Sequence, residues 1–347
     1  MTAPLRNRHD LAEPWEDLAA ETGAAPWLWP GWFNAWNSAF GSGTIEPVEV
    51  WRGGRLVGVA PMSRSRGALT SPTNWHTPWF GLLACDPGAE RQLADALFRR
   101  RAHRVTMAFV LATDLPAVRD AARRAGHRLL ERTLERSPYV DCETTTWEGY
   151  EATLGAKMRR ELRRRRRRLE AEGTLSFDVA DGTERLDALL DEGFAVEAAS
   201  WKGERETAIS SQPATERFYR DVARWAASRG WLRLGFLRLD DRALAFDFSI
   251  EAGGVHYLLK TGYDPARRES APGKLLRHEM LRRAFDAGVS SYEFLGTDEP
   301  WKLEWTTSRR DLRRLDAFAR SATGIAHWSA FTYGRPVAKR ALAAARR

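Results

Sequence analysis

The sequence predicts an α/β fold of the α+β kind, with two tandem domains that each contain a mixed, mostly antiparallel sheet flanked by helices. The chain has 347 residues, which is long for a single hydrophobic core. Stretches with strand and helix patterns alternate along it, as in sheet domains covered by helices. The order helix, antiparallel hairpin, strand, helix, strand occurs in outline in both halves. We therefore expect an N-terminal domain over residues 1–146 and a C-terminal domain over residues 147–347.

The first half supplies one full set of elements. Aromatic residues share one helical stripe within residues 26–40, which predicts a helix packed into the core. The turn Arg52-Gly53-Gly54 separates two strand-like runs and predicts a hairpin. The remaining elements expected here are helices over 90–102 and 115–125, and strands over 104–111 and 127–135.

The second half begins near Trp147 and repeats this order. A basic helix is expected over 155–172, because Gly173 is a good residue to end it. The other elements expected are helices over 183–199, 214–229 and 273–287, and strands over 174–180, WLRLGFLRL, ALAFDFSIE, VHYLLKTGYD and SYEFLG. The tail after Trp305 has a strand-like run, DLRRLDAFA, and a basic helix over 333–347, and both are expected to be peripheral.

Composition narrows the class of protein. No apolar run approaches the roughly 18–20 residues that span a bilayer, and the N-terminus lacks the apolar stretch of a signal peptide. Cys85 and Cys142 are too few for a disulfide framework, and the seven His residues have no metal-ligand spacing. These features predict a cytoplasmic, reduced, metal-free protein.

Positive charge is concentrated in one segment. The formal net charge is +8, and residues 157–168 hold one Lys and eight Arg against the single Glu161. The segment is either a solvated helix face or an anion-binding surface for the phosphates of a sugar nucleotide, a coenzyme or RNA.

A loop of small residues leads into the helix over 273–287. The sequence there is Arg268-Glu269-Ser270-Ala271-Pro272-Gly273, followed by Lys274. The N-terminus of a helix offers unpaired N–H groups and a positive dipole end, so this loop is a candidate phosphate site. The alternative is an ordinary Pro-Gly helix start.

Several motifs together resemble a known family. The segments LVGVAPM, KMRRELRRRRRRLEAEG, SWKG, YLLKTGYDPARRESAPGKLLRHEML and YEFLGTDEPWKLEW resemble the CelD/BcsL-type acetyltransferases, which belong with the Fem-type aminoacyltransferases in a superfamily of paired GNAT domains. GNAT enzymes carry a Q/R-x-x-G-x-G/A loop that binds the coenzyme A pyrophosphate. Here Arg268-x-x-Ala271-x-Gly273 departs from it by one Ala, and Pro272 lacks an N–H.

The resemblance implies an N-acyltransferase of two GNAT-like domains with its site in the C-terminal half. It implies acyl-CoA, with acetyl-CoA first, as the donor, and an amino sugar, an amino acid, a sugar nucleotide or another cell-envelope precursor as the acceptor. The alternative it implies is an aminoacyl-tRNA donor, with tRNA as a partner. A nucleic-acid-binding protein without catalysis is a weaker alternative, because the Arg run lacks interleaved aromatic residues. The oligomeric state stays open.

The implied chemistry gives each candidate residue a role. The expected donor-binding residues are Arg268, Ser270, Ala271, Gly273 and Lys274, and the expected substrate-binding residues are Lys157, Arg159, Arg163, Trp201, Lys202 and Glu293. Lys302 is the expected oxyanion donor because Trp301 and Trp305 could exclude water around it, although a surface Lys lying along its Trp neighbours is the alternative.

The proton must leave the attacking ammonium through a carboxylate. Asp247 is the first candidate because it interrupts an apolar strand, but if its side chain points outward it is ordinary alternation. Glu197 and Glu293 are the other candidates, and Tyr263 could donate to the thioester sulfur or an ester oxygen.

Overall fold

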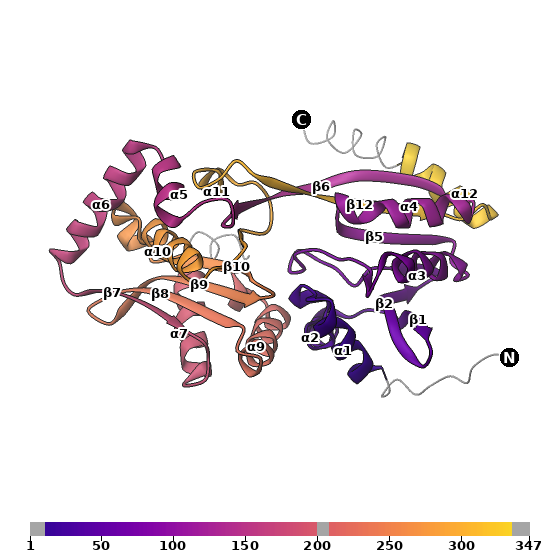
Figure 1. The fold of residues 1–347 in the computed structure, drawn as a ribbon, viewed down its shortest axis with the longest axis horizontal. Coiled ribbons are helices and arrows are strands. Elements are labelled where there is room, and N and C mark those ends of the chain that lie inside the picture. Colours follow the sequence, from indigo (N-terminus) through magenta and orange to yellow (C-terminus); the bar gives the residue numbers. More distant parts are fainter. Residues whose placement is uncertain (1–10, 200–207, 335–347) are drawn as a thin grey trace. The chain divides into compact units, whose positions relative to one another are not determined.

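The computed structural model describes residues 11–199 and 208–334. They form two compact units (Figure 1). The first comprises the chain up to Pro30, Gly41–Arg136 and Arg310 onward, and the second comprises Gly31–Phe40 and Ser137–Arg309. The predicted boundary at 146/147 lies ten residues after the division at 136/137. The prediction also placed one domain wholly after the other, whereas residues from Arg310 onward belong to the first unit.

The first unit is a sheet with the strand order β1-β2-β3-β5-β12-β6, to which β4 is added beside β2. Its elements are α1 (Ala12–Glu21), η2 (Pro26–Leu28), β1 (Thr44–Arg52), β2 (Arg55–Ser65), β3 (Ala68–Thr70), β4 (Leu83–Ala84), α3 (Pro87–Arg99), β5 (Arg104–Leu111), η3 (Ala112–Asp114), α4 (Leu115–Arg124), the start of β6 (Arg128–Asp141), β12 (Arg309–Phe318), α12 (Ala322–Ser329) and the π-helical turn η6 (Ala330–Gly334). The hairpin between β1 and β2 is confirmed, and Gly53 and Gly54 have φ values of 56° and 81°, the positive φ that a two-residue hairpin turn requires.

Strand β12 lies inside the first sheet, which corrects the expectation that the C-terminal strand is peripheral. It pairs antiparallel with β5, with Leu312 opposite Leu111, and has β6 as its other neighbour. Leu315 and Ala317 of β12 are fully buried in the hydrophobic cluster of this unit. The strand was predicted from its residues, but its place depends on pairing with strands about 200 residues earlier in the chain, which local sequence does not encode.

The second unit is a mixed sheet with the strand order β6-β11-β10-β9-β8-β7. Its elements are α2 (Pro30–Phe40), the end of β6, α5 (Trp147–Thr153), α6 (Ala156–Glu170), β7 (Leu175–Ala180), α7 (Leu186–Ala199), η4 (Ile209–Ser211), α9 (Pro213–Ser228), β8 (Leu232–Leu239), β9 (Arg242–Ala252), β10 (Val255–Tyr263), η5 (Pro265–Ser270), α10 (Pro272–Asp286), β11 (Ser291–Glu293) and α11 (Pro300–Leu303). Strands β10 and β11 are parallel, whereas β6–β11, β9–β10, β8–β9 and β7–β8 are antiparallel, which confirms the predicted mixed, mostly antiparallel sheet.

Helices cover both faces of this second sheet (Figure 1). Alternate residues of β9 show which face is which, because successive side chains of a strand point to opposite sides. Phe246 packs against Phe194 of α7, and Phe248 packs against Tyr219 of α9. Asp247, between them, bonds to Arg277 of α10. One face is therefore covered by α7 and α9, and the other by α10.

Among the helices of the described residues, none combines the length and the apolar character that crossing a bilayer requires.

Candidate functional site

The junction between β10 and α10 places the predicted donor-binding residues together. Asp264 organises the turn: one carboxylate oxygen accepts from the Ala266 N–H at 2.9 Å, and the other forms an ion pair with Arg242 at 2.6 Å. Ala271 then adopts a left-handed conformation, with φ 44° and ψ 55°, immediately before Pro272 begins α10. The turn and the first residues of the helix form one short segment, so Arg268 to Lys274 surround the start of α10.

The start of α10 offers few backbone donors. Pro272 has no N–H, and the N–H groups of Lys274 and Leu275 both donate to the Ala271 carbonyl, at 3.0 and 3.2 Å. The N–H of Gly273 has no protein acceptor among the described residues. An anion at this helix terminus would therefore meet one free N–H rather than the usual several.

Cationic side chains supplement this terminus. Arg268 is exposed and has no ion pair within the described part of the chain, whereas Lys274 pairs with Glu304. Ser270 is buried. Helix α6 lies beside the turn, because Arg168 pairs with Glu269 at 3.6 Å and Glu172, just past the helix, pairs with Arg267. The two predicted anion-binding features are thus neighbours within the second unit.

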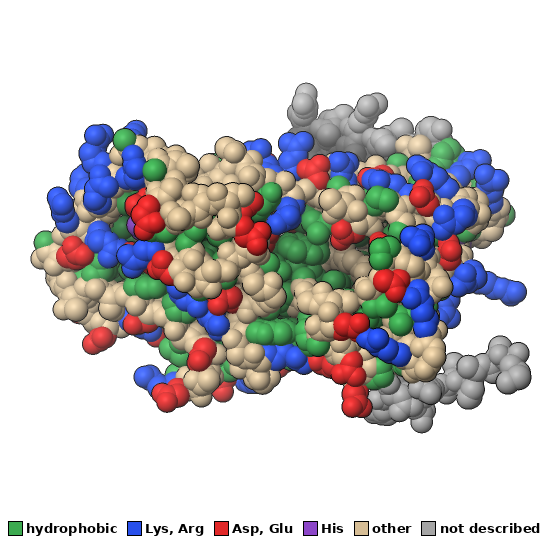
Figure 2. Space-filling model, in the orientation of Figure 1, with side chains coloured by type: hydrophobic (Ala, Val, Ile, Leu, Met, Phe, Trp, Pro, Cys, Tyr) green, Lys and Arg blue, Asp and Glu red, His purple; other side chains and the backbone are tan. Residues whose placement is uncertain are grey.

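Most cations of α6 face solvent. Figure 2 shows Lys and Arg side chains gathered over the region where Figure 1 places α6. Three of its Arg residues have acidic partners, namely Arg165 with Glu161, Arg166 with Glu279 and Arg168 with Glu269. In the described ranges, no ion pair is formed by Lys157, Arg159, Arg160, Arg163, Arg164 or Arg167. This helix is a surface of uncompensated positive charge.

The helical phase separates two of the predicted substrate-binding residues from the donor turn. At about 100° per residue, Arg159 and Arg163 lie within about 60° of Arg166, which points to Glu279 on the body of α10. Arg168, which contacts the turn, lies on the opposite flank, about 160° from Arg166. Arg159 and Arg163 therefore lie on a different side of α6 from Arg168.

Asp247 lies in a buried ion pair. Its carboxylate forms a two-pronged ion pair with Arg277, at 2.7 and 2.8 Å, and both side chains are at most 2% exposed. Burial alone lowers the pKa of the Arg277 guanidinium, but the Asp247 carboxylate outweighs it and the pKa is raised. A carboxylate paired with a buried guanidinium is less suited to take a proton from substrate than one without such a partner, which favours the other predicted carboxylates as the general base.

Lys302 is buried, as predicted, but its ammonium is occupied. It donates to the carbonyls of Leu295 and Thr297, at 2.7 and 2.9 Å, and pairs with Glu299 at 3.2 Å. An ammonium has three donors, and these three acceptors account for them. The geometry gives Lys302 the role of holding the loop after β11, where Leu295 and Gly296 have φ of 54° and 62°, and does not support an oxyanion role.

Glu293 ends β11 on the face covered by α7 and α9. Its neighbour Tyr292 points to Arg277 on the α10 face, so alternation turns Glu293 to the other side. It is buried, accepts from the Ser291 hydroxyl at 3.1 Å, and stands opposite Tyr257 in the last registered pair between β10 and β11. Strand β10 continues from there to Tyr263, with an extra residue, Leu259, that has no partner in the β9 register.

Glu197 lies on the face of the sheet that α7 and α9 cover, and its carboxylate contacts the backbone. This buried residue of α7 accepts from the Ile209 N–H at 2.9 Å. Its backbone lies so close to β10 that a Cβ at Gly262 would be 2.4 Å from the Glu197 Cα. The contact fixes α7 against β10 and holds the start of η4.

Tyr263, at the end of β10, borders the donor turn. It is half-buried, and a Cβ on Gly273 would lie 3.3 Å from its ring. No hydrogen bond of its hydroxyl is found within residues 11–199 and 208–334. The predicted substrate-binding residues Trp201 and Lys202 lie outside the described residues.

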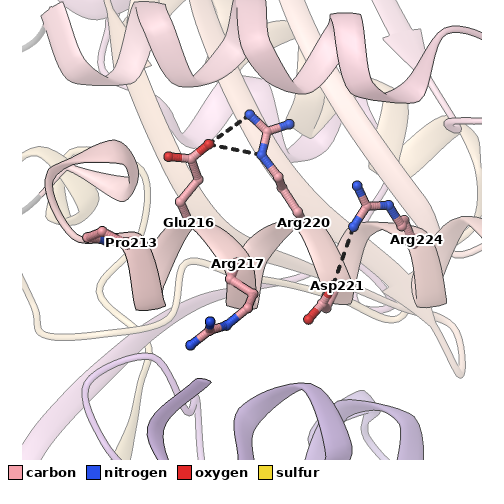
Figure 3. Close-up of a pocket in the computed structure, with 6 residues that line it drawn as sticks. All are labelled: Pro213, Glu216, Arg217, Arg220, Asp221 and Arg224. Atoms are coloured by element: carbon pink, nitrogen blue, oxygen red, sulfur yellow. Dashed lines mark hydrogen bonds and ion pairs between the residues drawn. The ribbon is translucent and has the colours of Figure 1, made fainter. Parts of the chain in front are cut away.

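A hollow elsewhere in the second unit does not carry this chemistry. It has a volume of about 320 Å³ and lies along the charged side of α9 (Figure 3). It is lined by Pro213, Glu216, Arg217, Arg220, Asp221 and Arg224. Its side chains pair with one another, Arg220 with Glu216 at 2.8 Å and Arg224 with Asp221 at 3.4 Å. The described residues also hold no group of three His, Cys, Asp or Glu side chains arranged for a metal ion.

Sequence reasoning missed Arg277. It contacts Asp247 on β9, Thr261 on β10 and Tyr292 on β11. The sequence feature that could have indicated it is a charged residue among the apolar positions of LLRHEML, next to Leu276 on the buried side of α10.

Protonation of buried histidines makes stability depend on pH. Burial lowers the pKa of His256, against the opposing effect of Glu251, and burial likewise lowers the pKa of His278 despite Glu151. The unfolded chain then binds more protons between the folded pKa and about 6.5, so this stabilisation is full above pH 6.5 and is lost as the pH falls. We expect Tm to decrease between pH 7 and pH 5, and to decrease less in His256→Phe. Equal decreases in calorimetric scans of both proteins would contradict this prediction.

Comparison with known proteins agrees with the architecture. Residues 156–303 match the family described as "Acetyltransferase (GNAT) domain". No curated protein matches the chain. The structure of FemX is similar, with a TM-score of 0.61 and 11% identity, covering 91% of this chain and 97% of that one. The C-terminal domain (DUF2156) of a protein described as a lysylphosphatidylglycerol synthetase from Agrobacterium fabrum is similar with a TM-score of 0.57 and 13% identity, covering 94% and 96%.

The match of residues 156–303 supports a transferase of the acyltransferase class. More specifically, residues 156–303 are a GNAT domain, and the predicted GNAT relationship is confirmed. The likeness to FemX extends over both units, because it covers 91% of the chain, and at 11% identity it shows a shared fold.

Proposed function

We propose that the protein is an N-acyltransferase that transfers an acyl group from acyl-CoA, with acetyl-CoA first, to an amine. The acceptor class comprises amino sugars, amino acids, sugar nucleotides and other cell-envelope precursors, and the cytoplasm is the proposed location. The observation that carries the proposal is the position of the α10 N-terminus beside Tyr263, at the end of the part of β10 that continues past its last pair with β11. A donor anchored there by its phosphates would direct its thioester toward Glu293.

The residues of this junction can supply the steps of the reaction. The Gly273 N–H and Arg268 would hold the pyrophosphate through charge-assisted hydrogen bonds. Glu293 would take the proton from the attacking ammonium. The backbone at Leu259, displaced from the β9 ladder by the bulge, would polarise the thioester carbonyl in place of Lys302. The amine forms the amide bond, the carbon–sulfur bond breaks, and Tyr263 would protonate the departing thiolate.

Calorimetry with coenzyme A and acetyl-CoA tests this proposal, together with thiol release in the presence of an amine panel. Micromolar to submillimolar binding with amine-dependent thiol release is expected. No detectable binding, alongside amide formation from aminoacyl-tRNA, would overturn the acyl-CoA donor.

The second candidate is an aminoacyl-tRNA-dependent aminoacyltransferase. Two observations favour it: the start of α10 presents one free N–H instead of several, and α6 presents six cations without ion pairs among the described residues. The names of the similar structures, FemX and a lysylphosphatidylglycerol synthetase domain, are the reason to test this donor alongside acyl-CoA.

Replacing cations on α6 should separate these donors. We expect the double variant Arg159→Gln/Arg163→Gln to weaken tRNA binding and to reduce the slope of log affinity against log salt by up to about 2, because each lost phosphate contact removes about one unit. Fluorescence titration with tRNA at several salt concentrations measures this slope. The control is Arg217→Gln/Arg224→Gln on α9, which should leave it unchanged. An unchanged slope in the α6 variant would assign Arg159 and Arg163 to a solvated helix face.

A further inference from the structure

Arg277 connects the donor helix to three strands at once. It lies on α10, one turn after Gly273, and its guanidinium donates a hydrogen bond to one carboxylate oxygen of Asp247 on β9 at 2.8 Å and forms an ion pair with the other at 2.7 Å. It also donates to the Tyr292 hydroxyl on β11 and, at 3.4 Å, to the Thr261 hydroxyl on β10. The side chain is 2% exposed. A charged group in this setting has little freedom to move, because each of its contacts replaces water that burial has removed.

These contacts bracket the end of the β10–β11 pairing. Tyr292 lies within the three registered pairs of β10 and β11, whereas Thr261 follows the bulge at Leu259, beyond the last pair. The guanidinium thus spans from the paired part of β11 to the continuing part of β10. The rings of Phe294 and Trp301 also lie near it, with centroids 5.8 and 5.9 Å from the guanidinium carbon, so it reaches the start of the loop held by Lys302.

From this geometry we infer that Arg277 is a positioning residue, which sets the distance between β10 and β11 and fixes the α10 terminus relative to both. The inference rests on the proposed function, since the gap it sets is where the acyl group would lie. Arg277 itself contacts neither donor nor acceptor. Its effect passes through the Gly273 N–H, which anchors the donor, and through Glu293, whose strand neighbour is Tyr292.

A charge-free replacement distinguishes positioning from stabilisation. Removing one partner of a buried ion pair leaves an uncompensated charge, whereas replacing both by apolar residues of similar volume is often neutral for stability. The double variant Asp247→Leu/Arg277→Met is therefore expected to keep its Tm within roughly 5 °C of the parent. Its kcat/KM should fall by about 10²-fold, because small misplacements of reacting groups cost this much. The loss should appear in kcat and in the donor KM, with the acceptor KM nearly unchanged.

The matched control is an ion pair that belongs to the first unit and is distant in sequence from β10 and α10. Arg119 and Glu131 of the first unit form a two-pronged pair at 2.8 Å. Arg119→Met/Glu131→Leu should leave kcat and both KM values at the parent level. If the Asp247/Arg277 double variant does not fold, Tyr292→Phe tests the positioning role instead, because it removes only the hydroxyl that accepts from Arg277. It should raise the donor KM several-fold at nearly constant Tm.

The kinetic measurements use whichever donor the parent accepts, acyl-CoA or aminoacyl-tRNA. A parent that uses aminoacyl-tRNA alone overturns the acyl-CoA proposal and leaves the same comparison of variants valid. A folded double variant with parental kcat and donor KM would overturn the positioning role. If the double variant fails to fold, a parental donor KM in Tyr292→Phe would overturn it.

Discussion

Replacement of Glu293 by Gln is expected to lower kcat by about 10²–10⁴-fold, the range for loss of a general base. The carboxylate is buried at the end of β11, on the face covered by α7 and α9 and beside the last registered pair of β10 and β11. Gln keeps the size of the side chain and an acceptor for Ser291, so the fold should persist. Steady-state thiol release measures the effect.

Glu197→Gln is the matched control for this experiment. Glu197 is a buried carboxylate on the same face, but its contact is with the Ile209 N–H. Gln retains an oxygen for that contact, so kcat should change by less than about tenfold. If Glu197→Gln reduced kcat as strongly as expected for Glu293→Gln while the latter stayed active, the base would have to be reassigned to Glu197.

The second large effect is expected at the donor turn. Gly273→Val should weaken acyl-CoA binding by about 10²-fold, which corresponds to about 2.7 kcal/mol. A Cβ at this position would lie 3.3 Å from the Tyr263 ring, and the branched side chain would crowd the one free N–H of the helix start. Calorimetry with acetyl-CoA measures the loss.

Gly155→Val is the control for the donor turn. Gly155 precedes α6 with φ −53° and ψ 145°, a conformation open to Val, and a Cβ there meets nothing within 4 Å. Its acetyl-CoA affinity should equal that of the parent. Parental affinity in Gly273→Val would place the donor phosphates elsewhere.

Local patterns were sufficient to predict most elements of the second unit. The strand over 242–252 is bounded by turn residues on both sides and is apolar at most positions, so its place follows from short-range chemistry, and its successive side chains alternate between the two faces of the sheet. The same alternation left Asp247 with two possible directions, because a period of two does not say which face is covered by α10. That choice depends on Arg277, which is 30 residues away in the chain.

The surroundings of the predicted site residues could not be read from the sequence where they depend on chain reversals or on helical phase. Lys302 has apolar sequence neighbours, and its burial could be expected from them. Its carbonyl partners exist because Leu295 and Gly296 turn the chain back with positive φ, and Leu in that conformation has no sequence signature. For Arg159 and Arg163, composition predicted an anion-binding helix, but the orientation of each Arg depended on how α6 packs through Leu162 and Leu169.

The central place of β12 has a consequence for biosynthesis. A ribosome releases the strands β1 to β5 and most of β6 long before it reaches residues 309–318, which belong between β5 and β6. At about 5–20 residues per second, this delay is roughly 10–40 s. Until then the sheet of the first unit lacks its strand between β5 and β6, whereas the strands of the second unit emerge consecutively after residue 136. We therefore expect the second unit to acquire protease resistance first on stalled ribosomes, although most of the first unit is synthesised earlier.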